Sequence, residues 1–141
     1  MARSSGQLLV GPGAGRMFPF GPAQLEVKVG AETGARGFRV FESSVAGGPA
    51  PHRHAVYEEA FYVLEGRIAY RLGDDWVEAS AGSSVFVPAG MVHCFHTVGE
   101  QPARHLVMVS PPEALDLIEA LGQTAPTDWP AIMARFDSEF M

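Results

Sequence analysis

The stretch from residue 51 to residue 59 constrains this chain most, because it carries two histidines and a glutamate close together. His52 and His54 are separated by one residue, so on a β-strand both imidazoles point to the same face. Glu59 follows, and His93 stands further along behind a proline- and glycine-containing turn. Neutral imidazole and carboxylate groups suit divalent transition metals. The pattern therefore predicts a metal site formed by His52, His54, Glu59 and His93, held between strands.

Strand alternation separates the inward from the outward residues around this cluster. It places Glu59 on one face with Phe61, and Glu58 on the opposite face as a solvated charge. We expect a substrate pocket lined by Phe61, Tyr70, Phe95 and Thr97, although aromatic residues at these positions are equally expected as core fillers. His105 is interpreted as structural.

Short β-type runs fill the first 110 residues. Residues 25–29 alternate apolar and polar strictly, as in a half-buried strand, whereas residues 60–64 form a nearly continuous apolar run that predicts burial on both faces. Residues 68–72 and 76–79 flank a glycine-containing loop and indicate a hairpin. Sixteen glycines and eleven prolines provide frequent turns. Residues 1–110 are therefore predicted to form an all-β sandwich or barrel.

The last part of the chain, residues 111–141, changes to helical periodicity. Ser110 and Glu113 have the spacing of a capping box at a helix start. Apolar residues then recur at helical intervals in two sets: Ala114, Leu117, Ile118 and Leu121, and Trp129, Ile132, Met133 and Phe136. We expect two short amphipathic helices that pack on the barrel, with a partner-binding helix as the alternative.

Composition excludes several classes of partner. The chain has 141 residues, enough for one domain, and a formal net charge of -6 with scattered arginines, so it shows no basic footprint for nucleic acid or an anionic membrane surface. No apolar run approaches the length of a membrane span, and the N-terminal apolar stretch is too short for a signal peptide. Cys94 is the single cysteine and has no partner for an intramolecular disulfide. These features predict a cytoplasmic protein.

Two motifs together resemble those of the cupin family. The first reads His52-x-His54-x4-Glu59-x6-Gly66, and the second reads Gly82-x5-Pro88-x-Gly90-x2-His93. The chain departs from the family pattern at Ala46, where glycine is usual, and at Thr97, where asparagine is usual. The resemblance implies a small single-domain cupin with a double-stranded β-helix (jelly-roll) barrel. It also implies one divalent metal per chain (Fe, Mn, Ni or Zn) on His52, His54, Glu59 and His93, and a homodimer.

The resemblance leaves three functions open. The preferred one is an oxygenase of the quercetinase type that acts on a small organic molecule, aromatic molecules included. The second is a non-oxidative isomerase, cyclase or lyase in which the metal is a Lewis acid. In either enzyme Glu59 is the candidate catalytic residue, as a proton shuttle. The third is a non-catalytic small-molecule-binding barrel with a structural metal.

Overall fold

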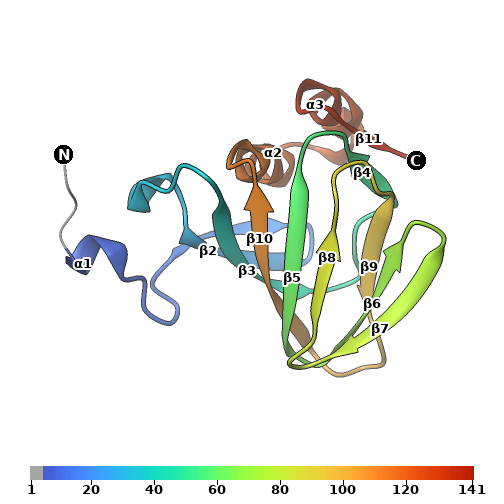
Figure 1. Cartoon of the computed structure of the whole chain (residues 1–141), viewed down its shortest axis with the longest axis horizontal. Helices are drawn as coiled ribbons and strands as arrows, with labels where there is room; N and C mark the ends of the chain where they lie inside the picture. The colour runs from blue at the N-terminus through green and yellow to red at the C-terminus, as the bar shows by residue number, and fades with distance from the viewer. Residues whose placement is uncertain (1–4) are drawn as a thin grey trace.

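The computed structural model describes residues 5–141 and shows two antiparallel sheets that face each other (Figure 1). Residues 1–4 lie outside the residues that the structure describes. They are the start of the predicted barrel segment and of the stretch considered as a signal peptide. Two short helices follow the strands near the end of the chain. The predicted all-β barrel with two short C-terminal helices is confirmed.

The larger sheet has six strands. Their spatial order is β1 (Arg16–Phe20), β2 (Ala23–Val29), β3 (Arg39–Val45), β10 (Ala103–Ser110), β5 (Glu58–Glu65) and β8 (Ser84–Val87). The central strand β10 pairs with β3 on one side and with β5 on the other, although β3 and β5 are far from it in sequence. This long-range pairing joins the two halves of the larger sheet.

The smaller sheet has five strands. Their order is β11 (Ser138–Phe140), β4 (His52–His54), β9 (His93–Thr97), β6 (Arg67–Leu72) and β7 (Asp75–Ser80). The predicted hairpin is the β6–β7 pair, which turns at Gly73, a residue with a φ of 66°. That φ lies in the left-handed region that glycine adopts without strain.

Helical segments flank the strands. They are α1 (Ser5–Leu8), the single 3-10 turns η1 (Ala31–Thr33) and η2 (Pro126–Asp128), α2 (Glu113–Gly122) and α3 (Trp129–Arg135). In Figure 1, α2 and α3 lie at the same end of the barrel, α2 beside the end of β10 and α3 near β4 and β11. Among residues 5–141, no helix combines the length and the apolar character that a membrane crossing requires.

The structure corrects two details of the sequence analysis. The run from residue 60 to 64 is not buried on both faces, because Tyr62 is 47% exposed while Phe61 and Val63 are buried. An antiparallel sheet can leave one face in water, and that is the case for β5. The predicted capping box also does not form, because the Ser110 hydroxyl donates to the Gly37 carbonyl, 2.8 Å away, and no side chain caps α2.

The strand β11 has no counterpart in the sequence analysis. It contains three residues, too few for a periodic pattern to show. It exists through its pairing with β4, in which Ser138 lies opposite His54 and Phe140 lies opposite His52. The end of the chain is thereby attached to the strand that carries two of the predicted ligands.

Candidate metal centre

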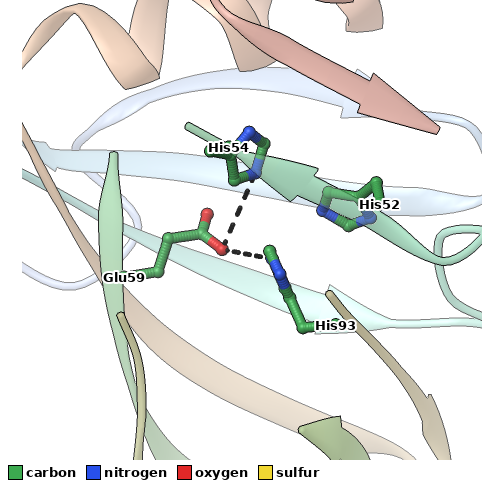
Figure 2. Close-up of side chains that lie close together, drawn as sticks. All are labelled: His52, His54, Glu59 and His93. Carbon is green, nitrogen blue, oxygen red and sulfur yellow. Dashed lines mark hydrogen bonds and ion pairs between the residues drawn. The ribbon is translucent and has the colours of Figure 1, made fainter. Parts of the chain in front are cut away.

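The four predicted ligands converge between the two sheets (Figure 2). His52 and His54 project from β4 and His93 from the start of β9, all in the smaller sheet, whereas Glu59 projects from β5 in the larger one. One ligand atom from each of the four residues can be chosen so that all lie within 4.8 Å of one another. The cluster therefore bridges the two sheets at a single point.

Strand register brings these side chains together. His52 lies directly opposite His93 in the β4–β9 pair, and their ring centroids are 4.2 Å apart. Glu59 is 8% exposed, while its neighbour Glu58 is exposed, as alternation predicts. His52, His54 and His93 are buried as well. Three imidazoles and a carboxylate are thus withdrawn from water, which is unfavourable unless they are paired or bind a cation.

Each histidine is oriented by a hydrogen bond from its Nδ1 atom. His52 Nδ1 donates to the Ala50 carbonyl at 2.8 Å, and His93 Nδ1 donates to the Met91 carbonyl at 2.9 Å. His54 Nδ1 lies 2.7 Å from Ser138 Oγ, and this hydroxyl donates a hydrogen bond to the Phe136 carbonyl. The serine oxygen is therefore the acceptor, and His54 Nδ1 is the donor. All three rings accordingly keep their Nε2 atoms available as ligands, as in metal sites whose outer groups fix the tautomer.

Electrostatics within the cluster favour an ionised carboxylate. Burial raises the pKa of Glu59, but the hydrogen bond with His93 and the attraction of the surrounding imidazoles outweigh it and lower this pKa to about 2. Glu59 Oε2 lies 2.9 Å from His93 Nε2 and 4.0 Å from His54 Nε2. Burial lowers the pKa of His52 to about 4, helped by the neighbouring imidazoles. A negative carboxylate among mainly neutral imidazoles is a donor set for a divalent cation.

This donor set passes a simple test of fit. His52 and His54 keep Nε2 unprotonated, His93 Nε2 shares a proton with the Glu59 carboxylate that a metal ion would displace, and the carboxylate supplies one negative charge at the same point. Nitrogen and oxygen ligands of this kind suit Zn, Fe, Mn and Ni, and they do not discriminate among these metals. The cluster can hold a metal ion whose identity is open.

An apolar cavity of about 240 Å³ opens beside the cluster. His52, His54 and Glu59 form part of its wall. Most of the remaining wall is aliphatic or aromatic, and it includes Phe41, Phe61, Phe95, Val107, Leu117 and Trp129. The site is therefore a cluster of ligands at the side of an apolar, concave chamber, which is the usual form of a small-molecule site.

The four residues predicted to line a substrate pocket divide into two pairs. Phe61 and Phe95 line the cavity, with ring centroids 5.6 Å apart. Tyr70 and Thr97 are not part of the wall. The Thr97 hydroxyl donates to the Val45 carbonyl, and Tyr70 is 1% exposed behind the two phenylalanines. Alternation gives the face of a strand correctly but not the depth at which a cavity ends.

Two contributions to the site were not predicted from the sequence. The helices α2 and α3 supply cavity wall through Leu117, Ile118 and Leu121, and through Trp129 and Met133. Helical periodicity identified these residues as an apolar face without showing that the face borders a chamber. His105, interpreted as structural, also lines the cavity.

Residues 40–109 match the family model described as the Cupin domain. Within that segment lie all four residues of the metal cluster. An uncharacterised protein of Streptomyces coelicolor is 35% identical over 78 residues, which are 55% of this chain and 70% of that protein.

Two further relatives have named activities. The polyketide synthase CurC of Streptomyces cyaneus is 32% identical over 85 residues, which are 60% of this chain and 54% of CurC. The solved structure of the polyketide cyclase RemF from Streptomyces resistomycificus superimposes with a TM-score of 0.57 at 30% identity, covering 62% of this chain and 64% of RemF. This chain spans less than two thirds of either relative.

Proposed function

The chain belongs to the cupin family, and from that premise we propose that it is a metal-dependent cyclase that closes a ring in a linear polyketone without an oxidant. The observation that carries the proposal is the position of the cluster of three histidines and one glutamate beside an apolar, aromatic-lined cavity. The similarity to CurC and to the polyketide cyclase RemF supports this choice of substrate. Polyketones present carbonyl oxygens to a metal and a flexible carbon chain to an apolar wall.

A divalent metal on His52, His54, Glu59 and His93 would supply Lewis-acid polarisation of a ketone oxygen. The buried imidazoles orient that centre through their Nδ1 hydrogen bonds, and they keep it inside the barrel. The cluster lies beside the cavity and not at the protein surface, so a ligand reaches it only by entering the chamber.

Glu59 is the group that can move a proton. Its carboxylate is ionised at neutral pH and can take a proton from a carbon that lies between two carbonyl groups. A pKa of about 2 makes it a weak base, so this transfer requires a carbon acid whose neighbouring carbonyl is already polarised. The carbon then bonds to a second carbonyl carbon, whose oxygen takes up the proton. Loss of one water completes an aldol condensation with no change of oxidation state.

The cavity wall controls the competing reactions. A linear polyketone can fold in several ways, and each fold gives a different ring. Phe61, Phe95 and Trp129 offer flat apolar surfaces on which one folded form can pack. The same surfaces exclude water, which protects reactive intermediates from side reactions.

The oxygenase preferred in the sequence analysis stays a prediction. Both it and the cyclase use the same cluster and cavity, and they differ in whether O2 is consumed. We place the cyclase first because a polyketide synthase and a polyketide cyclase are among the relatives that are at least 30% identical to this chain. Zinc, iron, manganese and nickel all remain open as the metal.

The experiment that tests the proposal is turnover of a synthetic linear tetraketide ester with carbonyls on alternate carbons. Products are separated by liquid chromatography and identified by mass, with and without O2. A cyclase gives a product that has lost one water, at the same rate in both atmospheres. Turnover that needs O2 would replace the cyclase with the oxygenase.

Two variants make the assay specific to the site. Glu59→Gln removes the proton acceptor, so turnover is expected to fall by about a hundredfold or more. Glu58→Gln is the matched control, because Glu58 is the adjacent glutamate and is exposed. Equal rates in the two variants would contradict the role of Glu59, and ring closure no faster than in protein-free buffer would contradict the enzyme.

A further inference from the structure

One more buried histidine on the cavity wall, besides His52 and His54, has no place in the proposed metal chemistry. His105, on β10, is 1% exposed and lines the cavity, but it is not part of the ligand cluster. Its ring packs among Phe61, Phe95 and Tyr70, with centroid distances of 5.1, 4.9 and 6.1 Å. An imidazole in so apolar a setting is unfavourable unless its nitrogens have partners.

One of its two nitrogens has a partner within the barrel. His105 Nδ1 lies 2.8 Å from the hydroxyl of Tyr70, and both residues are 1% exposed. Burial raises the pKa of the Tyr70 phenol, so the hydroxyl keeps its proton. Within residues 5–141, the acceptor for this hydroxyl proton is His105 Nδ1. The phenol therefore donates to Nδ1, and the proton of the neutral imidazole lies on Nε2.

The other nitrogen faces the cavity. In residues 5–141, every buried side-chain nitrogen or oxygen atom that is sealed from water has a hydrogen-bond partner. No such partner is recorded for His105 Nε2, so this atom is not sealed, although the residue as a whole is almost fully buried. The space that reaches it is the cavity that the side chain lines. An N–H donor thus points into an otherwise apolar region of the wall.

The other polar side chains on this wall are already engaged. The Ser43 hydroxyl donates to the Ser44 carbonyl, and Ser44 Oγ accepts from the Gln24 amide. His52, His54 and Glu59 belong to the ligand cluster. Burial lowers the pKa of His105 to about 4, with a smaller opposing effect from Glu59, so at neutral pH the ring is an uncharged donor. An uncharged N–H is suited to a carbonyl oxygen, whereas a carboxylate or phosphate would favour a cation.

We propose that Tyr70 and His105 form a carbonyl-binding subsite, in which His105 Nε2 donates a hydrogen bond to a ketone oxygen of a conjugated or aromatic ligand in the cavity. Tyr70 is a positioning residue that fixes the imidazole tautomer. The subsite rests on the proposed function in one respect, namely that the ligand is a ketone. It orients the ligand by binding one ketone oxygen, while a different ketone oxygen of the same ligand faces the metal cluster.

The test uses two small bicyclic probes that differ by one carbonyl, α-tetralone and tetralin. Trp129 lines the cavity, so quenching of its fluorescence reports binding without any need for turnover. Trp76 is 52% exposed on β7, and Trp76→Phe gives a parent protein in which Trp129 is the remaining tryptophan. Titrations are run on the protein as purified and again with a chelator, because a metal would also favour the ketone.

The parent is expected to bind tetralone about fivefold to tenfold tighter than tetralin, with and without chelator, which corresponds to one net hydrogen bond. His105→Phe should bring the ratio of the two dissociation constants close to one while tetralin binding is retained. Tyr70→Phe should reduce the ratio by about half or more, because the ring proton is then free to occupy either nitrogen. If His105→Phe does not fold, the Tyr70→Phe ratio decides.

Several results would overturn the subsite. The first is an unchanged ratio of the two dissociation constants in His105→Phe or, if that variant does not fold, in Tyr70→Phe. The second is a preference for tetralone that disappears from the parent when metal is chelated. The third is failure of the parent to bind either probe or to distinguish the two. The proposed function is judged separately by turnover of the tetraketide. If the parent turns over no tetraketide but His105→Phe loses the preference for the ketone, the subsite is upheld and the cyclase is rejected. If the parent turns over the tetraketide but the ratio of dissociation constants is unchanged in His105→Phe, the cyclase is upheld and the subsite is rejected.

Discussion

The hydroxyl of Ser138 lies 2.7 Å from Nδ1 of His54, although the two residues are 84 positions apart in the chain. The contact exists because the last strand, β11, pairs with β4. Ser138 Oγ donates a hydrogen bond to the Phe136 carbonyl, so it accepts one from His54 Nδ1 and leaves His54 Nε2 for a metal. The end of the chain thereby determines the orientation of a ligand in the middle of it.

Ser138→Ala should weaken metal binding without unfolding the barrel. The alanine removes the acceptor for His54 Nδ1–H, which frees the ring to rotate or change tautomer. Loss of such an outer partner lowers metal affinity by about tenfold to a hundredfold. Competition with a chromophoric chelator measures the change. Ser80→Ala is the matched control, since Ser80 is exposed at the end of β7; equal affinities in the two variants would show that Ser138 does not orient His54.

Metal content should depend on the inward histidines and not on histidines in general. His54→Ala removes one of the four donors, and purified protein should lose most of its metal as measured by inductively coupled plasma mass spectrometry. His96→Ala is the control, because His96 is an exposed histidine on β9 that packs against Trp76. It should retain the parent content. Metal retained by His54→Ala, or absent from the parent, would contradict the site.

Gly48 is expected to be intolerant of any side chain. Its φ is 143°, and a Cβ atom there would overlap the backbone oxygen of Phe95 on β9. Gly48→Ala should lower the free energy of unfolding by about 3 kcal/mol or more, through steric overlap in addition to backbone strain.

Gly47→Ala separates these two causes. Gly47 also has a positive φ, 85°, but a Cβ atom there would meet no atom within 4 Å. Strain alone should cost about 1 kcal/mol. Chemical denaturation measures both variants, and a Gly48→Ala protein as stable as Gly47→Ala would show that the Gly48–Phe95 contact relaxes easily.

Stability should fall in mild acid because of His105. Its pKa is about 4 in the folded protein, against an ordinary value of 6.5, because it is buried. The unfolded chain therefore takes up a proton first, and the stabilisation that is complete above pH 6.5 is lost as the pH falls toward 4. At about 1.4 kcal/mol for each pKa unit, the loss is on the order of 3 kcal/mol.

His105→Phe isolates this contribution from the other histidines. The difference in unfolding free energy between the parent and His105→Phe should shrink from about pH 7 to pH 4, because the variant has no proton to gain at that position. Urea denaturation with chelator present measures it, so that metal release does not contribute. A difference that stays constant across this range would mean that folded His105 titrates normally.

Local pattern was sufficient for much of the fold and for the composition of the cluster. One-residue spacing placed His52 and His54 on one face, and alternation separated Glu59 from Glu58, because successive side chains of a β-strand point to opposite faces. Helical periodicity found α2 and α3 because their apolar faces repeat every three to four residues. These are properties of short segments, and the residues within each segment are enough to specify them.

Other features depended on segments that meet only in three dimensions. The run at residues 60–64 carries no sign that Tyr62 faces water, since exposure depends on what covers the sheet. The strand β11 forms because β4 is there to pair with it, and His105 borders a cavity because α2, α3 and both sheets enclose one. The sequence alone thus determined the strands, the helices and the types of ligand. The tertiary structure decided which side chains orient those ligands and which face the chamber, because those relationships are set by distances between residues far apart in the chain.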